Sequence, residues 1–293
     1  MILNNNIIDK LKFELLLMGF NNKNLMLEKI RNKDGVFVYR VIIDKQSYVI
    51  KYFANIDFTR EIKSYEILKS VGVPTINTIA QTKHSILLED ICNSDVYRLG
   101  IAEDLKNENS ARMIAKWYKI LHGNGENVFG LSNLYNETDI IQKDRILKIK
   151  EKSNTQNNQV WDLILDNFNL IKNTISQCRQ TLTYNDFYWT NLIVSKNITK
   201  AMMFDYNLLG RGYRYSDIRN VCSSLSTTAQ RVFLDEYGSF DETEKIIDDG
   251  ISILVTLIFA FQKEKFPEWG KSSLEITKNG ELFNRINRII NLI

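Results

Sequence analysis

One stretch of the sequence decides the fold, residues 182–220: LTYNDFYWTNLIVSKNITKAMMFDYNLLGRGYRYSDIRN. In this stretch Asp186 is followed, after four residues, by Asn191, and two apolar runs then flank a polar turn at 195–200. The second apolar run leads directly to Asp205. Because two short apolar runs around a polar turn are typical of a β-hairpin, we expect Asn191 and Asp205 to return to the same end of a sheet.

These three polar residues fit the chemistry of phosphoryl transfer. Moving a γ-phosphoryl group to a hydroxyl requires a carboxylate beside the attacking oxygen and oxygen ligands for the Mg²⁺ ion on the phosphates. Mg²⁺ keeps several waters in proteins, so one Asp and one Asn are sufficient ligands. We therefore expect Asp186 to be the catalytic base, and Asn191 and Asp205 to be the metal ligands.

The stretch resembles the catalytic region of the aminoglycoside phosphotransferase and choline kinase superfamily. The family motif is His-Gly/Asn-Asp-x-x-x-x-Asn, then an apolar run ending in Ile/Phe-Asp, and then a further Asp. The corresponding residues here are Tyr184, Asn185, Asp186 and Asn191, then Phe204 and Asp205, and then Asp217. Tyr184 takes the place of the family's His, which buttresses the loop. The resemblance further implies that Asp217 hydrogen-bonds the catalytic loop.

The resemblance implies a bilobed, protein-kinase-like fold of the α+β class. We expect residues 1–91 to form a small N-lobe, an antiparallel sheet with one helix, that binds the nucleotide. Residues 92–293 are then a larger, mostly helical C-lobe with the catalytic loop and the acceptor-binding helices.

Lys51 lies within an aromatic and β-branched pattern that predicts strands over residues 36–43 and 47–53. On a two-residue period it shares a face with Val49 and Phe53. A lysine on a buried face needs an anion, whereas a lysine on an edge strand extends its amine to water. The resemblance favours the first interpretation, because the family has a phosphate-contacting lysine at this place.

The helix predicted over residues 57–70 carries two glutamates that can pair with Lys51. Glu61 lies at the border of the apolar face that includes Tyr65, and Glu66 is the competing candidate. The resemblance favours Glu61 as the partner that positions the lysine for the α and β phosphates. An exposed helix carboxylate is the alternative.

Two further segments are assigned to the nucleotide by the resemblance alone. The turn at 31–35, which contains Gly35, corresponds to the family's loop over the triphosphate, although an ordinary hairpin turn explains it equally well. The segment that includes Leu88, Glu89 and Ile91 corresponds to the hinge that contacts the base through main-chain groups. The expected cofactors are therefore Mg²⁺ and ATP or GTP.

A small-molecule acceptor is favoured by the absence of a protein-kinase activation segment. Asp205 is not followed by Phe-Gly, and the only prolines, Pro74 and Pro267, leave no Ala-Pro-Glu motif. The acidic segment 235–250 has two interpretations. Acidic residues bind the cationic acceptor in aminoglycoside kinases, and a solvated helix face explains the same charges.

The rest of the chain predicts helices. One helix is expected to end at His122-Gly123 with the glycine as its C-cap, and His122 is interpreted as structural. Two more are predicted over 138–152 and 159–178.

Composition excludes several classes of protein. The chain has 293 residues, 44% of them hydrophobic, and a formal net charge of +3, which argues against a nucleic-acid partner. Three widely spaced cysteines and two histidines exclude a disulfide framework and a His-rich metal site. The most apolar run, 251–261, is shorter than the roughly 18–20 residues that span a bilayer. We expect a cytoplasmic protein without a membrane partner, a monomer or weak dimer.

Together these features predict an enzyme, a small-molecule kinase. It moves the γ-phosphate of ATP or GTP to a hydroxyl of a small, amine-bearing molecule that is aminoglycoside-like or choline-like. The alternative is a nucleotide-binding pseudokinase or structural member of the same superfamily. Tyr184 in place of His is the one sequence feature that favours this alternative.

Overall fold

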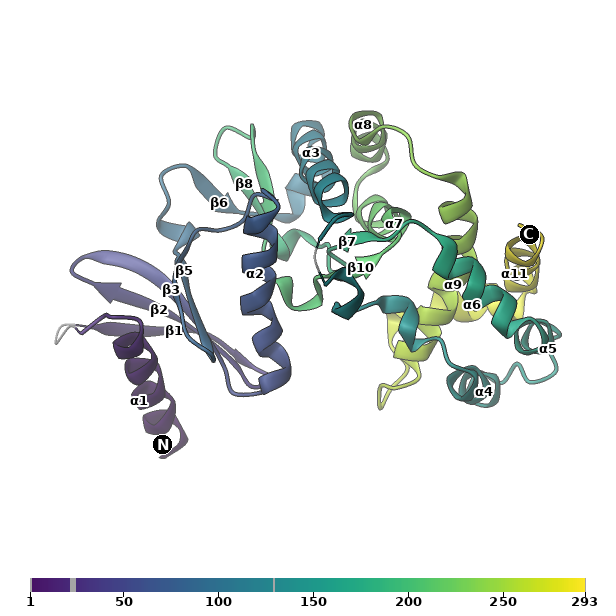
Figure 1. Ribbon diagram of the computed structural model, residues 1–293, viewed down its shortest axis with the longest axis horizontal. Coiled ribbons are helices and arrows are strands. Elements are labelled where there is room, and N and C mark those ends of the chain that lie inside the picture. The colour runs from purple at the N-terminus through teal and green to yellow at the C-terminus, as the bar shows by residue number, and fades with distance from the viewer. Residues whose placement is uncertain (1, 22–24, 129, 293) are drawn as a thin grey trace. The chain divides into compact units, whose positions relative to one another are not determined.

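The computed structural model describes residues 2–21, 25–128 and 130–292 (Figure 1). The chain divides into two compact units, which are described separately. The first unit comprises Met1–Asn124, Asp186–Leu209 and Ser224–Tyr237, and the second comprises Gly125–Asn185, Gly210–Ser223 and Gly238–Ile293. Helices and antiparallel strands occur together, as the α+β prediction requires.

An antiparallel sheet organises the first unit. Within the described residues its strand order is β1-β2-β3-β5-β4. The strands are β1 (Met26–Lys33), β2 (Val36–Ile43), β3 (Gln46–Phe53), β4 (Thr78–Gln81) and β5 (Ser85–Glu89). The β1–β2 turn, Asp34 and Gly35, and the β2–β3 turn, Asp44 and Lys45, have positive φ at both positions. This conformation matches the twist of the flanking strands in a two-residue hairpin.

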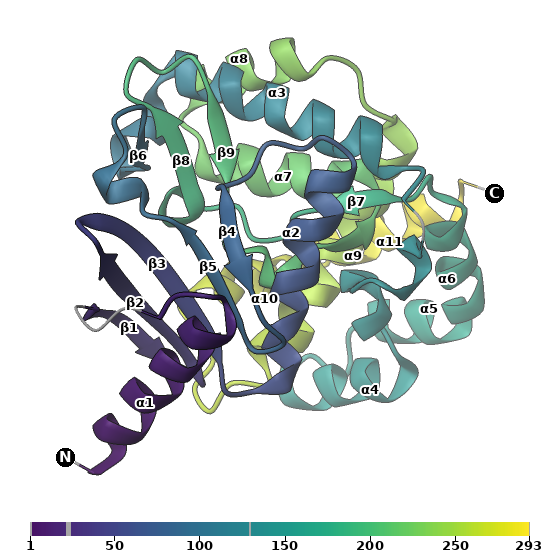
Figure 2. The same ribbon diagram turned by 60° about the vertical axis from the view of Figure 1, so that its left-hand side comes forward.

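Alternation along the strands gives the sheet two different faces. Helix α1 (Ile2–Leu17) covers one face, where Leu11 and Leu15 belong to the same buried cluster as Tyr39 and Val41 (Figures 1 and 2). The residues between them in sequence, such as Arg40, point to the other face. That second face lines the site described below.

The remaining elements of the first unit include the predicted hairpin. Strands β8 (Leu192–Ser195) and β9 (Ala201–Met203) pair antiparallel, and β6 (Tyr97–Leu99) joins β8. The helices are α2 (Arg60–Ser70), α3 (Glu108–Gly125), whose last residue begins the second unit, and α8 (Thr227–Tyr237). The hairpin closes as expected, since the Phe204 amide donates to the Asn191 carbonyl at 3.0 Å.

The second unit is mostly helical. Its helices are α4 (Lys143–Lys152), α5 (Val160–Asp166), α6 (Phe168–Gln177), α7 (Arg214–Ser224), α9 (Glu242–Ala260), α10 (Lys271–Lys278) and α11 (Glu281–Ile290). Strands β7 (Thr181–Thr183) and β10 (Gly210–Gly212) form a short antiparallel pair. Its core is centred on α9, where Ile251 and Leu254 pack with Trp161 and Ile286. Across the described ranges, no helix combines the length and hydrophobicity needed to cross a bilayer.

Three predicted helix boundaries were wrong. Helix α3 continues through Gly123 to Gly125, because Gly123 does not adopt the left-handed conformation of a C-cap. The helix predicted over 159–178 is two helices that meet at Asn167, whose side-chain amide donates to the Leu163 carbonyl at 2.9 Å. Helix α4 begins at Lys143, after a separate short turn at Glu137–Ile140.

Candidate active site

A cavity of about 580 Å³ opens within the first unit, a volume typical of small-molecule sites. The cavity face of the sheet supplies Val36, Val38 and Val49 from β2 and β3. The lining residues from other elements include Glu61, Leu88, Ile91, Asn191 and Asp205. The cavity therefore brings together strands, a helix and the hairpin end that carry most of the predicted site residues.

Lys51 is a buried cation that lines this cavity. Its Nζ lies 2.6 and 2.7 Å from the two carboxylate oxygens of Glu61 and 3.2 Å from Oδ1 of Asp205. Burial acts to lower the pKa of the Lys51 amine, but the charges of Glu61 and Asp205 outweigh burial and raise the pKa. The lysine is therefore charged, and it is not the water-exposed edge lysine of the alternative interpretation.

Glu61, not Glu66, is the partner of Lys51. The Glu61 side chain is 2% exposed and lies in the first turn of α2, directed toward the sheet. Glu66 is exposed and accepts a hydrogen bond from Gln81 instead. A buried ion pair with both carboxylate oxygens engaged holds the ammonium group in one place.

Asp205 lies two residues beyond β9 with a left-handed backbone, φ 63° and ψ 67°. Asp and Asn tolerate this conformation better than most residues, and such conformations cluster at functional sites. One carboxylate oxygen accepts from Lys51, whereas the other, Oδ2, accepts no hydrogen bond from any described residue. The side chain is 32% exposed, so this oxygen is available to a ligand.

Asp186 and Asn191 form a second small group beside the cavity. The Asn191 side-chain nitrogen donates to the Asp186 carbonyl and to its carboxylate Oδ2, both at 3.0 Å. This use of the nitrogen leaves the Asn191 amide oxygen without a partner among the described residues. Burial and the charge of Asp205 raise the pKa of Asp186 to about 6 against the hydrogen bond from Asn191, and this value suits a general base near neutral pH.

The donor set fits Mg²⁺. Asp205 offers a carboxylate oxygen and Asn191 an amide oxygen, both hard ligands with no other commitment inside the described chain. No group of three or more His, Cys, Asp and Glu residues suited to a metal occurs among the described residues. An ion held here would therefore complete its shell with waters and phosphate oxygens, as Mg²⁺ does.

Asp217, in the second unit, holds the main chain that leads to Asp186, the predicted base. Its two oxygens accept from the backbone N–H groups of Tyr184 and Asn185 at 2.8 and 2.9 Å. Asn185 has a positive φ of 64°, so the chain turns sharply just before Asp186. The Tyr184 side chain is fully buried. The predicted hydrogen bonding between Asp217 and the loop, whose N–H groups donate, is thus confirmed.

The two segments assigned to the nucleotide also meet the cavity. Leu88, Glu89 and Ile91 line it along the end of β5 and the short turn that follows. In the β1–β2 turn, the residues on either side of Gly35, Asp34 and Val36, line the same cavity. Their nucleotide contacts stay predictions.

Sequence reasoning missed Arg40, which lines the cavity from β2. The signal was present, because Arg40 follows Val36 and Val38 on the same two-residue period that singled out Lys51. A charged residue inside an apolar strand needs a partner, and Arg40 finds one in Asp90 at 2.7 Å.

Two other predicted groups are structural. His122 is buried, and its Nδ1 lies 2.8 Å from the Tyr237 hydroxyl. In the acidic segment 235–250, Asp248 is 1% exposed and bonds Arg219 at 2.6 Å, while Glu244 accepts from the Tyr215 backbone N–H at 3.0 Å. These two carboxylates are not a solvated face, and both have internal partners.

Comparison with known proteins identifies the fold. No protein-family model matches the sequence, and no curated protein matches it. A solved choline kinase from Streptococcus pneumoniae is 16% identical, with 96% of this chain and 99% of that chain covered and a TM-score of 0.63. A choline/ethanolamine kinase family protein from Mesorhizobium loti is 14% identical, with 99% of each chain covered and a TM-score of 0.67.

A spectinomycin phosphotransferase, solved with ADP and spectinomycin, is 13% identical, with 96% of this chain and 97% of that chain covered and a TM-score of 0.54. The chain therefore has the kinase-like fold shared by these phosphotransferases, as the sequence predicted.

Proposed function

We propose that the protein is a phosphotransferase that moves the γ-phosphoryl group of ATP or GTP to a hydroxyl of a small, amine-bearing molecule. One observation carries this proposal. A buried, charged lysine contacts Glu61 and Asp205 in the same cavity to which Asn191 contributes. A fixed cation beside uncommitted oxygen ligands is the arrangement that positions the phosphates and a magnesium ion in phosphoryl transfer.

Asp186 is the proposed base. The acceptor hydroxyl transfers its proton to the Asp186 carboxylate as its oxygen forms a bond to the γ-phosphorus. The bond from that phosphorus to the bridging oxygen breaks, and the nucleoside diphosphate leaves with the electron pair. The hydrogen bond from Asn191 orients the carboxylate, and its raised pKa suits acceptance of a proton.

Lys51 is proposed to contact the α and β phosphates. Because Glu61 engages the ammonium group through both carboxylate oxygens, the lysine cannot rotate away when the cavity is empty. Asn191 and Asp205 are the proposed Mg²⁺ ligands, and bound Mg²⁺ would neutralise charge that develops on the phosphate oxygens. The main chain at Leu88, Glu89 and Ile91 is proposed to bind the base.

The amine-bearing acceptor is supported by the similar structures, which include proteins named for choline and for spectinomycin. The acidic segment 235–250 supports it less than the sequence suggested. Glu244 and Asp248 are occupied by Tyr215, Arg219 and Tyr213 and have little capacity for a ligand.

A nucleotide-binding pseudokinase is the alternative, and Tyr184 is the feature that favours it. The Tyr184 side chain is fully buried, so the substitution removes no polar group from the cavity. Lys51, Asp186, Asn191 and Asp205 are all present with the contacts described above. This supports the enzyme over the alternative.

The test is transfer of labelled phosphate from γ-labelled ATP and GTP, with Mg²⁺, to choline, ethanolamine, spectinomycin and a panel of aminoglycosides and sugars. We expect transfer to at least one hydroxyl and its loss in Asp186→Asn. The matched control is Asp166→Asn, an exposed aspartate of the second unit. If the wild type binds nucleotide but phosphorylates none of the panel, the pseudokinase is supported instead.

A further inference from the structure

A second cavity of about 820 Å³ lies on the same face of the sheet as the proposed nucleotide cavity. In the strand register Val38 pairs with Lys51, Arg40 with Val49, and Ile42 with Ser47. The first two pairs line the proposed nucleotide cavity, and the last pair lines the second cavity. The two cavities therefore follow one another along the sheet.

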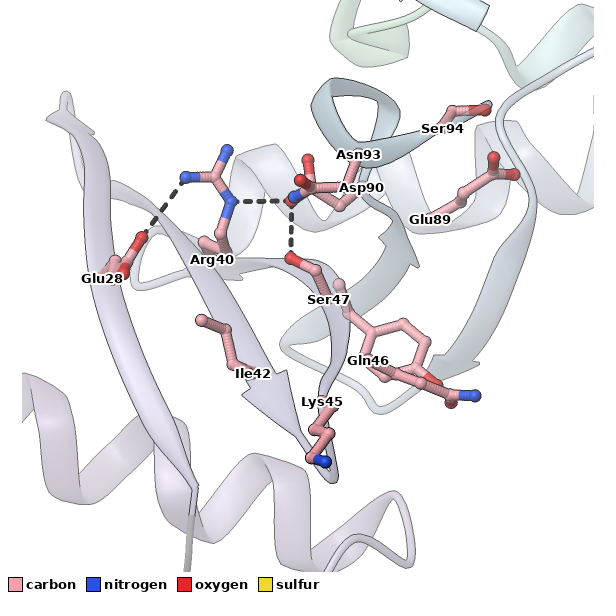
Figure 3. Close-up of a pocket in the computed structure, with 11 residues that line it drawn as sticks. Glu28, Arg40, Ile42, Lys45, Gln46, Ser47, Glu89, Asp90, Asn93 and Ser94 are labelled. Carbon is pink, nitrogen blue, oxygen red and sulfur yellow. Dashed lines mark hydrogen bonds and ion pairs between the residues drawn. The ribbon is translucent and has the colours of Figure 1, made fainter. Parts of the chain in front are cut away.

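Three residues line both cavities, Arg40, Glu89 and Asp90. Figure 3 shows the Arg40 guanidinium between Glu28 and Asp90, with Ser47 also directed at the Asp90 carboxylate. The boundary between the cavities is thus a network of charged and polar side chains, whose centre is Asp90.

Asp90 is a buried carboxylate with a complete set of donors. Its side chain is 2% exposed. The donors are Arg40 Nε at 2.7 Å, Ser47 Oγ at 2.7 Å, Asn93 Nδ2 at 2.6 Å and the Cys92 backbone N–H at 3.1 Å. Burial acts to raise the pKa of Asp90, but the hydrogen bonds from Arg40, Ser47 and Asn93 outweigh it and keep the pKa below its ordinary value. The carboxylate is therefore ionised at neutral pH.

The donors come from separate elements. Arg40 belongs to β2, Ser47 to β3, and Asn93 to the short turn after β5. Arg40 is itself fixed, because its neighbours Tyr39 and Val41 are buried under α1. The network consequently ties the segment that follows β5 to the rigid centre of the sheet. That segment contains Ile91, one of the three residues whose main chain is proposed to bind the base, and it directly follows the other two, Leu88 and Glu89.

We propose that Arg40 and Asp90 are positioning residues that set the nucleotide affinity of this cavity and its choice between adenine and guanine. This inference rests on the proposed function. Adenine presents a donor at C6 where guanine presents an acceptor, so main-chain groups select one base only if they are held in place. Sites of this kind require their groups to stay within about 0.5 Å of the productive geometry.

The alternative role is purely structural. In that case the loss of Arg40 lowers the stability of the fold and reduces the apparent kcat in proportion to the folded fraction, while both KM values and the base preference stay unchanged. A positioning role differs, because it changes the KM for the nucleotide and the base preference while kcat and the KM for the acceptor stay near their wild-type values.

The experiment measures the Kd of Mg·ATP and Mg·GTP by displacement of a fluorescent nucleotide from the full chain, together with kinetics and Tm. We expect Arg40→Met to weaken the preferred nucleotide about tenfold and to move the ratio of the two Kd values toward one by about threefold, since the segment is no longer held. Arg40→Lys keeps the positive charge, and we expect it to retain part of the nucleotide affinity and part of the base preference. The control Lys29→Met removes an exposed cation from the neighbouring strand β1. We expect it to change neither the Kd of the preferred nucleotide nor the ratio of the two Kd values.

A milder variant keeps the test valid if Arg40→Met fails to fold. Ser47→Ala removes one neutral donor and leaves Asp90 paired with Arg40, and we expect it to weaken nucleotide binding about threefold. Folded variants with wild-type Kd values and an unchanged ratio overturn the inference while the proposed function stands. A wild type that binds neither nucleotide contradicts the proposed function itself.

Discussion

One accessible carboxylate of the first unit and two buried carboxylates of the second differ in what their oxygens do. In the first unit Asp205 is 32% exposed and keeps one oxygen without a partner. In the second unit Asp217 and Asp248 are buried, and hydrogen bonds from the chain engage both oxygens of each. The comparison shows that Asp217 and Asp248, whose oxygens all have partners, support the fold of the second unit, whereas the accessible oxygen of Asp205 is available to a ligand.

Loss of the proposed base is the largest expected effect. Asp186→Asn keeps the shape of the side chain but cannot accept a proton, so we expect kcat to fall by about 10²–10⁴-fold. Asp186 is not a core residue, and Tm is expected to stay close to that of the wild type. Steady-state transfer assays at saturating ATP check this prediction, and a loss of activity that only follows a loss of folded protein would contradict it.

Asp248 tests the structural half of the comparison. Asp248→Asn leaves Arg219 without its buried counter-charge, and we expect a loss of about 3 kcal/mol in the free energy of unfolding. Urea denaturation measures it, and the ATP affinity of the folded variant should be unchanged. The neighbouring Asp249→Asn breaks a more exposed pair with Arg288 and serves as the control, with less than about 1 kcal/mol expected. Equal losses for the two variants would refute the distinction.

Glu137, also in the second unit, differs from Asp217 and Asp248 in that its raised pKa predicts a dependence of stability on pH. Burial, with Asp248 and Asp217, raises the pKa of Glu137 from 4.5 to about 7 against the charge of Arg219. The stability that this group contributes is therefore fully present below pH 4.5 and lost as the pH rises through 7, by about 3 kcal/mol. Unfolding measured between pH 4.5 and 8 should be flatter in Glu137→Gln than in the exposed control Glu151→Gln. Identical pH profiles would exclude this effect.

The cysteines test the proposed nucleotide cavity without any substitution. Cys92 is exposed and lines the proposed nucleotide cavity, whereas burial raises the pKa of the Cys178 thiol to about 12. At pH 8 we expect iodoacetamide to modify Cys92 about 100-fold faster than Cys178, because the thiolate is the reactive form. Mg·ATP should slow only the reaction at Cys92. Mass spectrometry of the modified peptides measures both rates, and an absence of protection would contradict nucleotide binding at this cavity.

Much of the site could be predicted, because its signals are local in sequence. The spacing of Asp186, Asn191 and Asp205 predicted a hairpin that returns two of them to one place, and β8 and β9 form that hairpin. The two-residue alternation put Lys51 on one face with Val49 and Phe53, the resemblance favoured an anion partner there, and Lys51 lines the cavity. In each case the period of the strand fixes the direction of the side chain.

The parts that sequence reasoning missed depend on distant contacts. Gly123 looked like a helix end, but a glycine stays helical where no left-handed turn follows. The Arg40–Asp90 pair joins residues 50 positions apart, which no local pattern shows. Both interpretations of the acidic segment were open to sequence reasoning, because Tyr213 and Arg219, the partners of Asp248, lie about 30 residues away.

The most direct test of the central claim is the dependence of ATP affinity on Mg²⁺, measured by calorimetry for the wild type and Asp205→Asn. Asn also tolerates the left-handed backbone at this position, so the substitution changes the charge and not the fold. We expect Mg²⁺ to tighten ATP binding about tenfold or more in the wild type and to have little effect in the variant. If the wild type binds ATP equally with and without Mg²⁺, or if Asp205→Asn keeps the full effect, Asp205 and Asn191 do not form a metal site.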